Sequence, residues 1–215
     1  MTNKRRIIFL CGEAEGDAFR THVAEIAPEV ETQWVASVAS LDFATRRDGE
    51  RTRLISFLTD VIVPARILER LGPTPYNIHP GSPDYPGAHG LSFAIYEEAE
   101  VFGVTVHEMA ASVDTGAIVR ADRFPLPSEA ELLQFGSEVY AHAVQAAAKV
   151  IEHAVRTDDL LPHARESWAS RQCTRAKLNA LLTSADYLLP ADRARLRRAC
   201  GPHWDKHMRA QASHG

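Results

Sequence analysis

The chain alternates between short apolar runs and longer polar segments with helical spacing. Apolar or β-branched runs of about four to eight residues that end at glycine, proline or polar clusters are typical of strands. The predicted strands are Arg6–Cys11, Thr32–Ser37, Arg53–Leu58, Tyr76–His79, Phe102–Met109 and Ala117–Phe124. Helices are predicted at 17–27, 65–71 and 91–99. This alternation indicates crossover connections, and therefore an α/β fold with a mostly parallel sheet flanked by helices.

The last third of the chain is predicted to be helical. The elements are a long amphipathic helix over Ser128–Val155, a linker over Asp158–Pro162 and short helices over Lys177–Leu182 and Pro190–Cys200. Ser128 followed by Glu131 is a capping-box pattern for the start of the long helix. We therefore expect a main domain over residues 1–157 and a small helical C-terminal extension over residues 158–215.

Composition is that of a globular protein. The 215 residues are 45% hydrophobic and 24% charged, which indicates one domain of ordinary size with an appended subdomain. Three widely spaced cysteines argue against a disulfide framework and fit a reducing compartment. The apolar run near the N-terminus is about five residues long, whereas a signal peptide needs about 7 and a membrane helix about 20. We predict a cytoplasmic protein without a membrane partner.

Charge is unevenly distributed around a net of −4. Residues 160–215 contain ten Lys or Arg and four Asp or Glu, a net of +6, so the first 159 residues carry −10. A basic tail can bind nucleic acid through its phosphates, or it can form a solvated face that balances the acidic domain. The tail has apolar residues at helical spacing, namely Leu178, Leu181, Leu182, Leu188, Leu189 and Leu196. They favour a tail that packs on the main domain, and nucleic acid is the less favoured partner.

Three residues combine into a site that can polarise a carbonyl group. Asn77 and His79 lie two residues apart at the end of a predicted strand, and Asp114 follows the next strand along the chain. Individually they are read as a backbone cap, a structural histidine and a turn aspartate. Together they can stabilise an oxyanion and transfer one proton. The ends of parallel strands are where ligands bind in such sheets, which favours the second interpretation.

Four ordered motifs carry a resemblance to a known family. They are Asn-x-His-Pro from Asn77, Tyr-Pro-Gly-x-His from Tyr85, Gly-Val-Thr-Val-His from Gly103 and Asp-x-Gly from Asp114. In this order they resemble the folate-dependent formyltransferases, which act on glycinamide ribonucleotide, methionyl-tRNA or sugar amines. The resemblance spans about residues 59–124. It implies a Rossmann-like domain that moves a formyl group from 10-formyltetrahydrofolate to a primary amine of a small acceptor, such as a sugar nucleotide or an amino-acid-like molecule.

The resemblance also implies roles for individual residues. Asn77, His79 and Asp114 take the catalytic positions, and no metal is required. The expected folate contacts are Arg66, Ile67, Leu68, His107 and Val113. His89 is either a loop residue or an acceptor contact. His203 and His207 have a helical spacing that metal ligands sometimes use, but a solvated pair is the favoured interpretation.

The N-terminal loop departs from one branch of this family. Glycinamide ribonucleotide enzymes have a Gly-Ser-Asn phosphate loop after the first strand, whereas this chain has Gly12-Glu13-Ala14-Glu15-Gly16-Asp17. Backbone N–H groups here can hold phosphate, but the adjacent carboxylates would repel it. Gly12 and Glu13 are therefore candidate acceptor contacts, and a ribonucleotide phosphate is disfavoured.

Three alternatives to transfer onto a small amine stay open at this level. Asn77, His79 and Asp114 would serve water as well as an amine, so the enzyme could be a 10-formyltetrahydrofolate hydrolase. A methionyl-tRNA type of formyltransferase is disfavoured, because the tail does not resemble that family's β-barrel domain. A non-catalytic protein that senses folate is disfavoured by the complete set of three residues. The sequence specifies neither the amine nor the oligomeric state.

Overall fold

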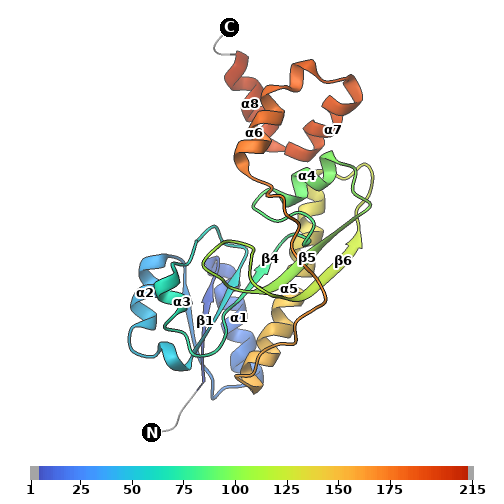
Figure 1. The fold of residues 1–215 in the computed structure, drawn as a ribbon. Helices are drawn as coiled ribbons and strands as arrows, with labels where there is room; N and C mark the ends of the chain where they lie inside the picture. Colours follow the sequence, from blue (N-terminus) through green and yellow to red (C-terminus); the bar gives the residue numbers. More distant parts are fainter. Residues whose placement is uncertain (1–4, 213–215) are drawn as a thin grey trace. The chain divides into compact units, whose positions relative to one another are not determined.

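The computed structural model describes residues 5–212 and contains a six-stranded sheet flanked by helices (Figure 1). The strands are β1 (Arg6–Leu10), β2 (Glu31–Val35), β3 (Thr52–Phe57), β4 (Tyr76–His79), β5 (Val101–Glu108) and β6 (Ile118–Pro125). The α-helices are α1 (Glu13–Ile26), α2 (Val38–Thr45), α3 (Ala65–Leu68), α4 (Gly90–Tyr96), α5 (Leu132–Arg156), α6 (Arg175–Thr183), α7 (Pro190–Cys200) and α8 (Pro202–Ala212). Single 3₁₀ turns occupy Gly49–Arg51 and Ala185–Tyr187.

The strand order is β2-β1-β3-β4-β5-β6, and the first four strands are parallel. Strand β5 then pairs antiparallel with β4, with Asn77 opposite His107. A crossover helix is needed between parallel neighbours, and α1, α2 and α3 lie between consecutive parallel strands in the sequence. The predicted mostly parallel sheet with flanking helices is confirmed.

The chain forms two compact units. The first unit contains residues 1–80, 105–121 and 143–167, and the second contains residues 81–104, 122–142 and 168–215. Strands β5 and β6 and helix α5 each run from one unit into the other. The sequence predicts a domain boundary after residue 157, and this boundary stays a prediction.

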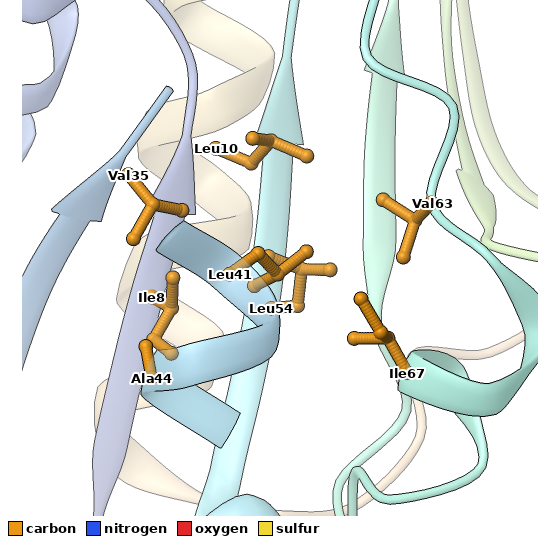
Figure 2. Packing of buried hydrophobic residues seen from close by; sticks show 8 residues of the cluster. All are labelled: Ile8, Leu10, Val35, Leu41, Ala44, Leu54, Val63 and Ile67. Atoms are coloured by element: carbon orange, nitrogen blue, oxygen red, sulfur yellow. The ribbon is translucent and has the colours of Figure 1, made fainter. Parts of the chain in front are cut away.

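Apolar side chains fill both faces of the sheet in the first unit. On one face, Ile8 and Leu10 of β1 and Leu54 of β3 pack with α2 and α3 (Figure 2). On the other face, the ring of Phe19 from α1 lies 5.5 Å from the ring of Phe9 and 5.1 Å from that of Phe57. The strands β1 and β3 are buried throughout, because side chains on alternate positions meet helices on opposite sides.

The second unit has a helical core of its own. Phe93 of α4 packs with Leu178 and Leu182 of α6, Leu196 of α7 and Trp204 of α8. This packing confirms that the C-terminal leucines turn towards earlier parts of the chain. Leu189, which precedes α7, is an exception, because this residue is 72% exposed.

Basic residues of α7 pair with acidic residues that precede the tail. Arg195 forms an ion pair with Glu98, and Arg198 Nη1 lies 3.2 Å from Glu129 Oε2. Arg193 pairs within the tail, with its Nη1 3.1 Å from Asp186 Oδ1. Part of the positive charge of the tail therefore balances acidic side chains inside the same unit, which agrees with the favoured of the two interpretations of the charge distribution.

Two predicted helix starts are wrong by four residues each. Helix α1 begins at Glu13 rather than Asp17, and α5 begins at Leu132 rather than Ser128. Ser128 therefore does not cap α5; the chain bends before the helix, where Leu126 N donates to Glu100 O and Ala130 N to Pro127 O. Helix α8 was not predicted. Within residues 5–212, no helix combines the length and apolarity needed to cross a membrane.

Candidate active site

The carboxyl ends of three parallel strands meet at one edge of the sheet. Strand β1 ends before Cys11 and Gly12, β3 ends before Leu58, and β4 ends at His79. Ligands bind at this edge in open α/β sheets, since loops there can project polar groups without breaking the ladder. Two of the three residues predicted to be catalytic, Asn77 and His79, lie on β4.

Asn77 and His79 lie on the same face of β4, because alternate residues of a strand share a face. In the antiparallel pairing with β5, Asn77 is opposite His107 and His79 is opposite Thr105. Asn77 is partly buried, whereas His79 is 7% and His107 4% exposed. The pleat therefore collects an amide and two imidazoles on one patch of the sheet.

Asp114 reaches this patch from the loop between β5 and β6. Its carboxylate Oδ1 lies 3.6 Å from His79 Nδ1 and 3.5 Å from His107 Nε2, and the residue is 3% exposed. Its backbone φ is 50°, in the left-handed region that Asp tolerates better than most residues. The structure thus brings together Asn77, His79, His107 and Asp114, which are up to 37 positions apart in the chain.

His107 makes two hydrogen bonds with groups around its ring. Its Nδ1 lies 2.8 Å from the carbonyl oxygen of Glu108, and its Nε2 lies 3.0 Å from Asn77 Nδ2. On the basis of the sequence resemblance, we expect His107 to line the folate site, and that role stays a prediction. The contact with Asn77 was not predicted, because nothing in the sequence specifies which β5 residue faces which β4 residue.

Two backbone features near the site were also missed. Leu58, directly after β3, has a φ of 44°, which is rare for a bulky side chain and indicates local strain. Gly116 follows Asp114 closely, and a Cβ there would collide with the main-chain oxygen of Glu108. Glycine at this position allows the loop that carries Asp114 to lie directly against the end of β5.

The predicted folate contacts lie in two places in the first unit. Ile67 on α3 is fully buried in the core, main chain included, and its role as a folate contact stays a prediction. Leu68 packs against the same core, and Arg66 is directed to solvent with its Nη2 3.9 Å from Asp42 Oδ1. Val113, next to Asp114, is 53% exposed. An apolar, exposed residue beside the site is available for contact with a ring system.

The N-terminus of α1 lies at the same edge of the sheet, after β1. Gly12 is the N-cap residue and Glu13 the first helical residue. The carboxylate of Glu15 folds back over Gly12, since a Cβ at position 12 would collide with it. Burial, and then the charge of Glu15, raise the pKa of Cys11 to about 12, so this thiol is protonated at neutral pH. The helix N-terminus therefore already has a carboxylate where a phosphate would bind.

His89 belongs to the second unit. It precedes α4, donates its backbone N–H to Cys173 O at 3.1 Å, and its ring lies 6.0 Å from that of His203. In the part of the chain that the structure describes, no group of three or more His, Cys, Asp or Glu side chains could hold a metal ion. The spacing of His203 and His207 therefore has no ligand set around it in α8.

These features define an α/β protein with an Asn–His–Asp site at the carboxyl edge of its sheet. Residues 57–151 match the family model of the formyl transferases. The resemblance read from the sequence motifs is confirmed, and the match contains all four residues of the site. The match extends beyond residue 124, into α5.

Solved structures with this fold include N-formyltransferases and HypX. A sugar N-formyltransferase from a Shewanella species has a TM-score of 0.71 at 18% identity, over 91% of this chain and 87% of that one. HypX from Aquifex aeolicus, solved with tetrahydrofolic acid, has a TM-score of 0.68 at 20% identity, over 92% of this chain but only 34% of its own. An N-formyltransferase from Helicobacter canadensis, solved with folinic acid and dTDP-3-aminofucose, has a TM-score of 0.66 at 15% identity, over 91% and 80% of the two chains.

Proposed function

We propose that this protein transfers a formyl group from 10-formyltetrahydrofolate to the primary amine of an amino sugar. The observation that carries the proposal is the cluster of Asn77, His79, His107 and Asp114 inside the stretch that matches the formyl transferases. The neighbours add support, because one is a sugar N-formyltransferase, another is an N-formyltransferase solved with dTDP-3-aminofucose, and two were solved with a folate. At identities of 20% or less these neighbours support the fold, and the residues of the site support the chemistry.

The proposed reaction needs hydrogen-bond donors to the developing oxyanion and a group that accepts a proton. The unprotonated amine attacks the formyl carbon, a carbon–nitrogen bond forms, and the formyl oxygen becomes negative. The Asn77 amide and the His79 imidazole stabilise that oxygen by donating hydrogen bonds. The amine then loses a proton, the bond between the formyl carbon and the folate nitrogen breaks, and that nitrogen gains a proton. Asp114, 3.6 Å from His79 Nδ1, keeps the imidazole oriented and balances its charge as the proton moves.

The burial of the site suits this chemistry. His79, His107 and Asp114 are each at most 7% exposed, and charges interact more strongly where water is excluded. The carboxylates of Glu13 and Glu15 at the start of α1 disfavour a phosphate at that helix end and favour a positively charged group. An acceptor that presents an amine rather than a phosphate to this edge of the sheet fits these charges.

The proposal is tested by turnover with a panel of acceptors. Purified protein is incubated with 10-formyltetrahydrofolate and, separately, nucleotide-linked amino sugars, free amino sugars, amino acids, an aminoacyl-tRNA or buffer alone. Tetrahydrofolate release is followed by absorbance, and the formylated product is identified by mass spectrometry. We expect a formamide product with an amino sugar. Formate release that does not depend on an amine would replace this function with hydrolysis.

A matched pair of variants ties the activity to the site. Asn77→Ala should lower kcat by about 10² to 10³, as the loss of one oxyanion donor does in other enzymes. Asn179→Ala removes the same amide from the exposed face of α6, in the other compact unit, and should leave kcat unchanged. Equal activity of the two variants would remove Asn77 from the proposed mechanism.

A further inference from the structure

The surroundings of His107 determine which of its nitrogens carries a proton. Its Nδ1 lies 2.8 Å from the main-chain oxygen of Glu108, and a carbonyl oxygen can only accept a hydrogen bond. Nδ1 must therefore carry the proton. In the neutral ring, Nε2 is then an acceptor with a lone pair.

Two contacts hold Glu108, whose carbonyl oxygen accepts from His107 Nδ1, in place. The backbone N–H of Glu108 donates to Ala117 O at 2.9 Å, which ties the end of β5 to the start of β6. The Glu108 side chain is also held, since its Oε1 lies 2.8 Å from His163 Nε2. The carbonyl that selects the His107 tautomer is therefore part of an anchored strand end.

The tautomer in turn fixes the amide of Asn77. The group that Asn77 presents to His107 Nε2, 3.0 Å away, must be its NH₂, because the lone pair of the ring cannot bond to the amide oxygen. One N–H of the Asn77 amide then donates to His107 Nε2, and the second N–H stays available to donate to another acceptor. If the amide turned over, it would present its oxygen where a donor is needed, and a developing oxyanion would be repelled.

The carboxylate of Asp114 competes for the same ring nitrogen. Its Oδ1 lies 3.5 Å from His107 Nε2, a longer distance than the 3.0 Å to Asn77 Nδ2. Of these two groups only the amide can donate to a lone pair on Nε2, and it is also the nearer one, so Asn77 is the hydrogen-bond partner of this nitrogen.

We propose that His107 is a positioning residue that sets the direction of the Asn77 amide through its Nδ1–H tautomer. The proposal rests on the proposed function, in which Asn77 donates to the formyl oxygen. It differs from the expected role of His107 as a folate contact, because the ring acts through Asn77. The effect should therefore appear in kcat, with the KM for the folate changed less than about threefold, since the interaction is made in the transition state.

Two variants with amide side chains of different length separate this role from simple filling of space. In His107→Gln the side-chain oxygen can reach the position of Nε2 and accept from Asn77. In His107→Asn the side chain reaches only the position of Nδ1, so Asn77 loses its partner. We expect His107→Asn to lower kcat by about 10² and His107→Gln to recover at least about tenfold of that loss. Equal kcat for the two variants, with both folded by circular dichroism, would overturn the proposal.

The tautomer is measured independently of catalysis. In ligand-free protein labelled with ¹⁵N-histidine, the imidazole shifts and two-bond couplings identify the protonated nitrogen, and the His107 signals are assigned by their loss in His107→Gln. We expect a neutral ring protonated at Nδ1. A ring protonated at Nε2 would overturn the proposal whether or not the enzyme forms a formamide. If the wild type had no formyl-transfer activity while the Nδ1–H ring was observed, the proposed function alone would fail.

Discussion

Asp114 offers the sharpest separation between chemistry and stability in this site. Its side chain is buried between two imidazoles, while its backbone has a φ of 50°. Asp114→Asn removes the charge but keeps the shape, and Asn tolerates the left-handed region. Asp114→Ala also removes the charge, but Ala is less stable than Asn in the left-handed backbone conformation. Both variants therefore lose the carboxylate, and only Asp114→Ala adds backbone strain.

The magnitudes follow from the geometry. Both variants lose the carboxylate that orients His79 and balances its charge, so kcat should fall by about 10² to 10⁴ in each, or about 2.7–5.4 kcal/mol of transition-state stabilisation. Ala in the left-handed region costs roughly 1–2 kcal/mol, and that cost is absent for Asn. The free energy of unfolding should therefore fall by about 1–2 kcal/mol more in Asp114→Ala than in Asp114→Asn.

Two measurements on the same preparations decide the matter. Steady-state formyl transfer at saturating donor and acceptor gives kcat, and urea unfolding followed by circular dichroism gives the stability difference. A value of kcat for Asp114→Asn within about threefold of wild type would refute the role of the carboxylate. Equal stability of the two variants would refute the argument from the backbone and leave the chemistry untouched.

Three further predictions concern packing, thiol reactivity and the pH dependence of stability. Gly116→Ala should lower the free energy of unfolding by about 1–3 kcal/mol and reduce kcat, because the added methyl group collides with Glu108 O and moves the loop that carries Asp114. Gly136→Ala is the control, since nothing lies within 4 Å of the added Cβ. Equal urea midpoints for the two variants would contradict the argument. The three cysteines are free and buried, and burial raises the pKa of Cys200, like that of Cys11, to about 12. We therefore expect almost no reaction of the thiols with a thiol reagent at pH 8 until urea is added. Fast labelling of the native protein would contradict this prediction. Because unfolded thiols ionise near pH 9, these two residues should lower stability as the pH rises above about 9.

Local signals predicted some elements accurately. The bounds of β4 match the prediction, because Pro80 and Gly81 stop the strand directly after His79. The bounds of α7 also match, because Pro190 is the first helical residue and Gly201, with a φ of 49°, ends the helix. In both cases the residues that end the element are adjacent to it in the chain.

The start of α5 shows where local signals fail. Ser128 and Glu131 have the types and spacing of a capping box, yet the helix starts at Leu132. Leu126 N donates to Glu100 O, a residue far away in the sequence, and this contact holds the approach to the helix in a bend. Because this hydrogen bond joins distant parts of the chain, the bend before the helix cannot be seen in the local capping pattern.

The sequence by itself determined that Asn77 and His79 share a face at the end of a strand, since side chains alternate with a period of two. Its ordered motifs also indicated the family, and with it the place of Asp114. Only the tertiary structure decided that Asn77 faces His107, 30 positions away, and that Asp114 takes a left-handed backbone to lie between the two imidazoles. The physical reason is register: one strand's pattern specifies its own faces, whereas the packing of the whole sheet specifies which residue of the next strand lies opposite.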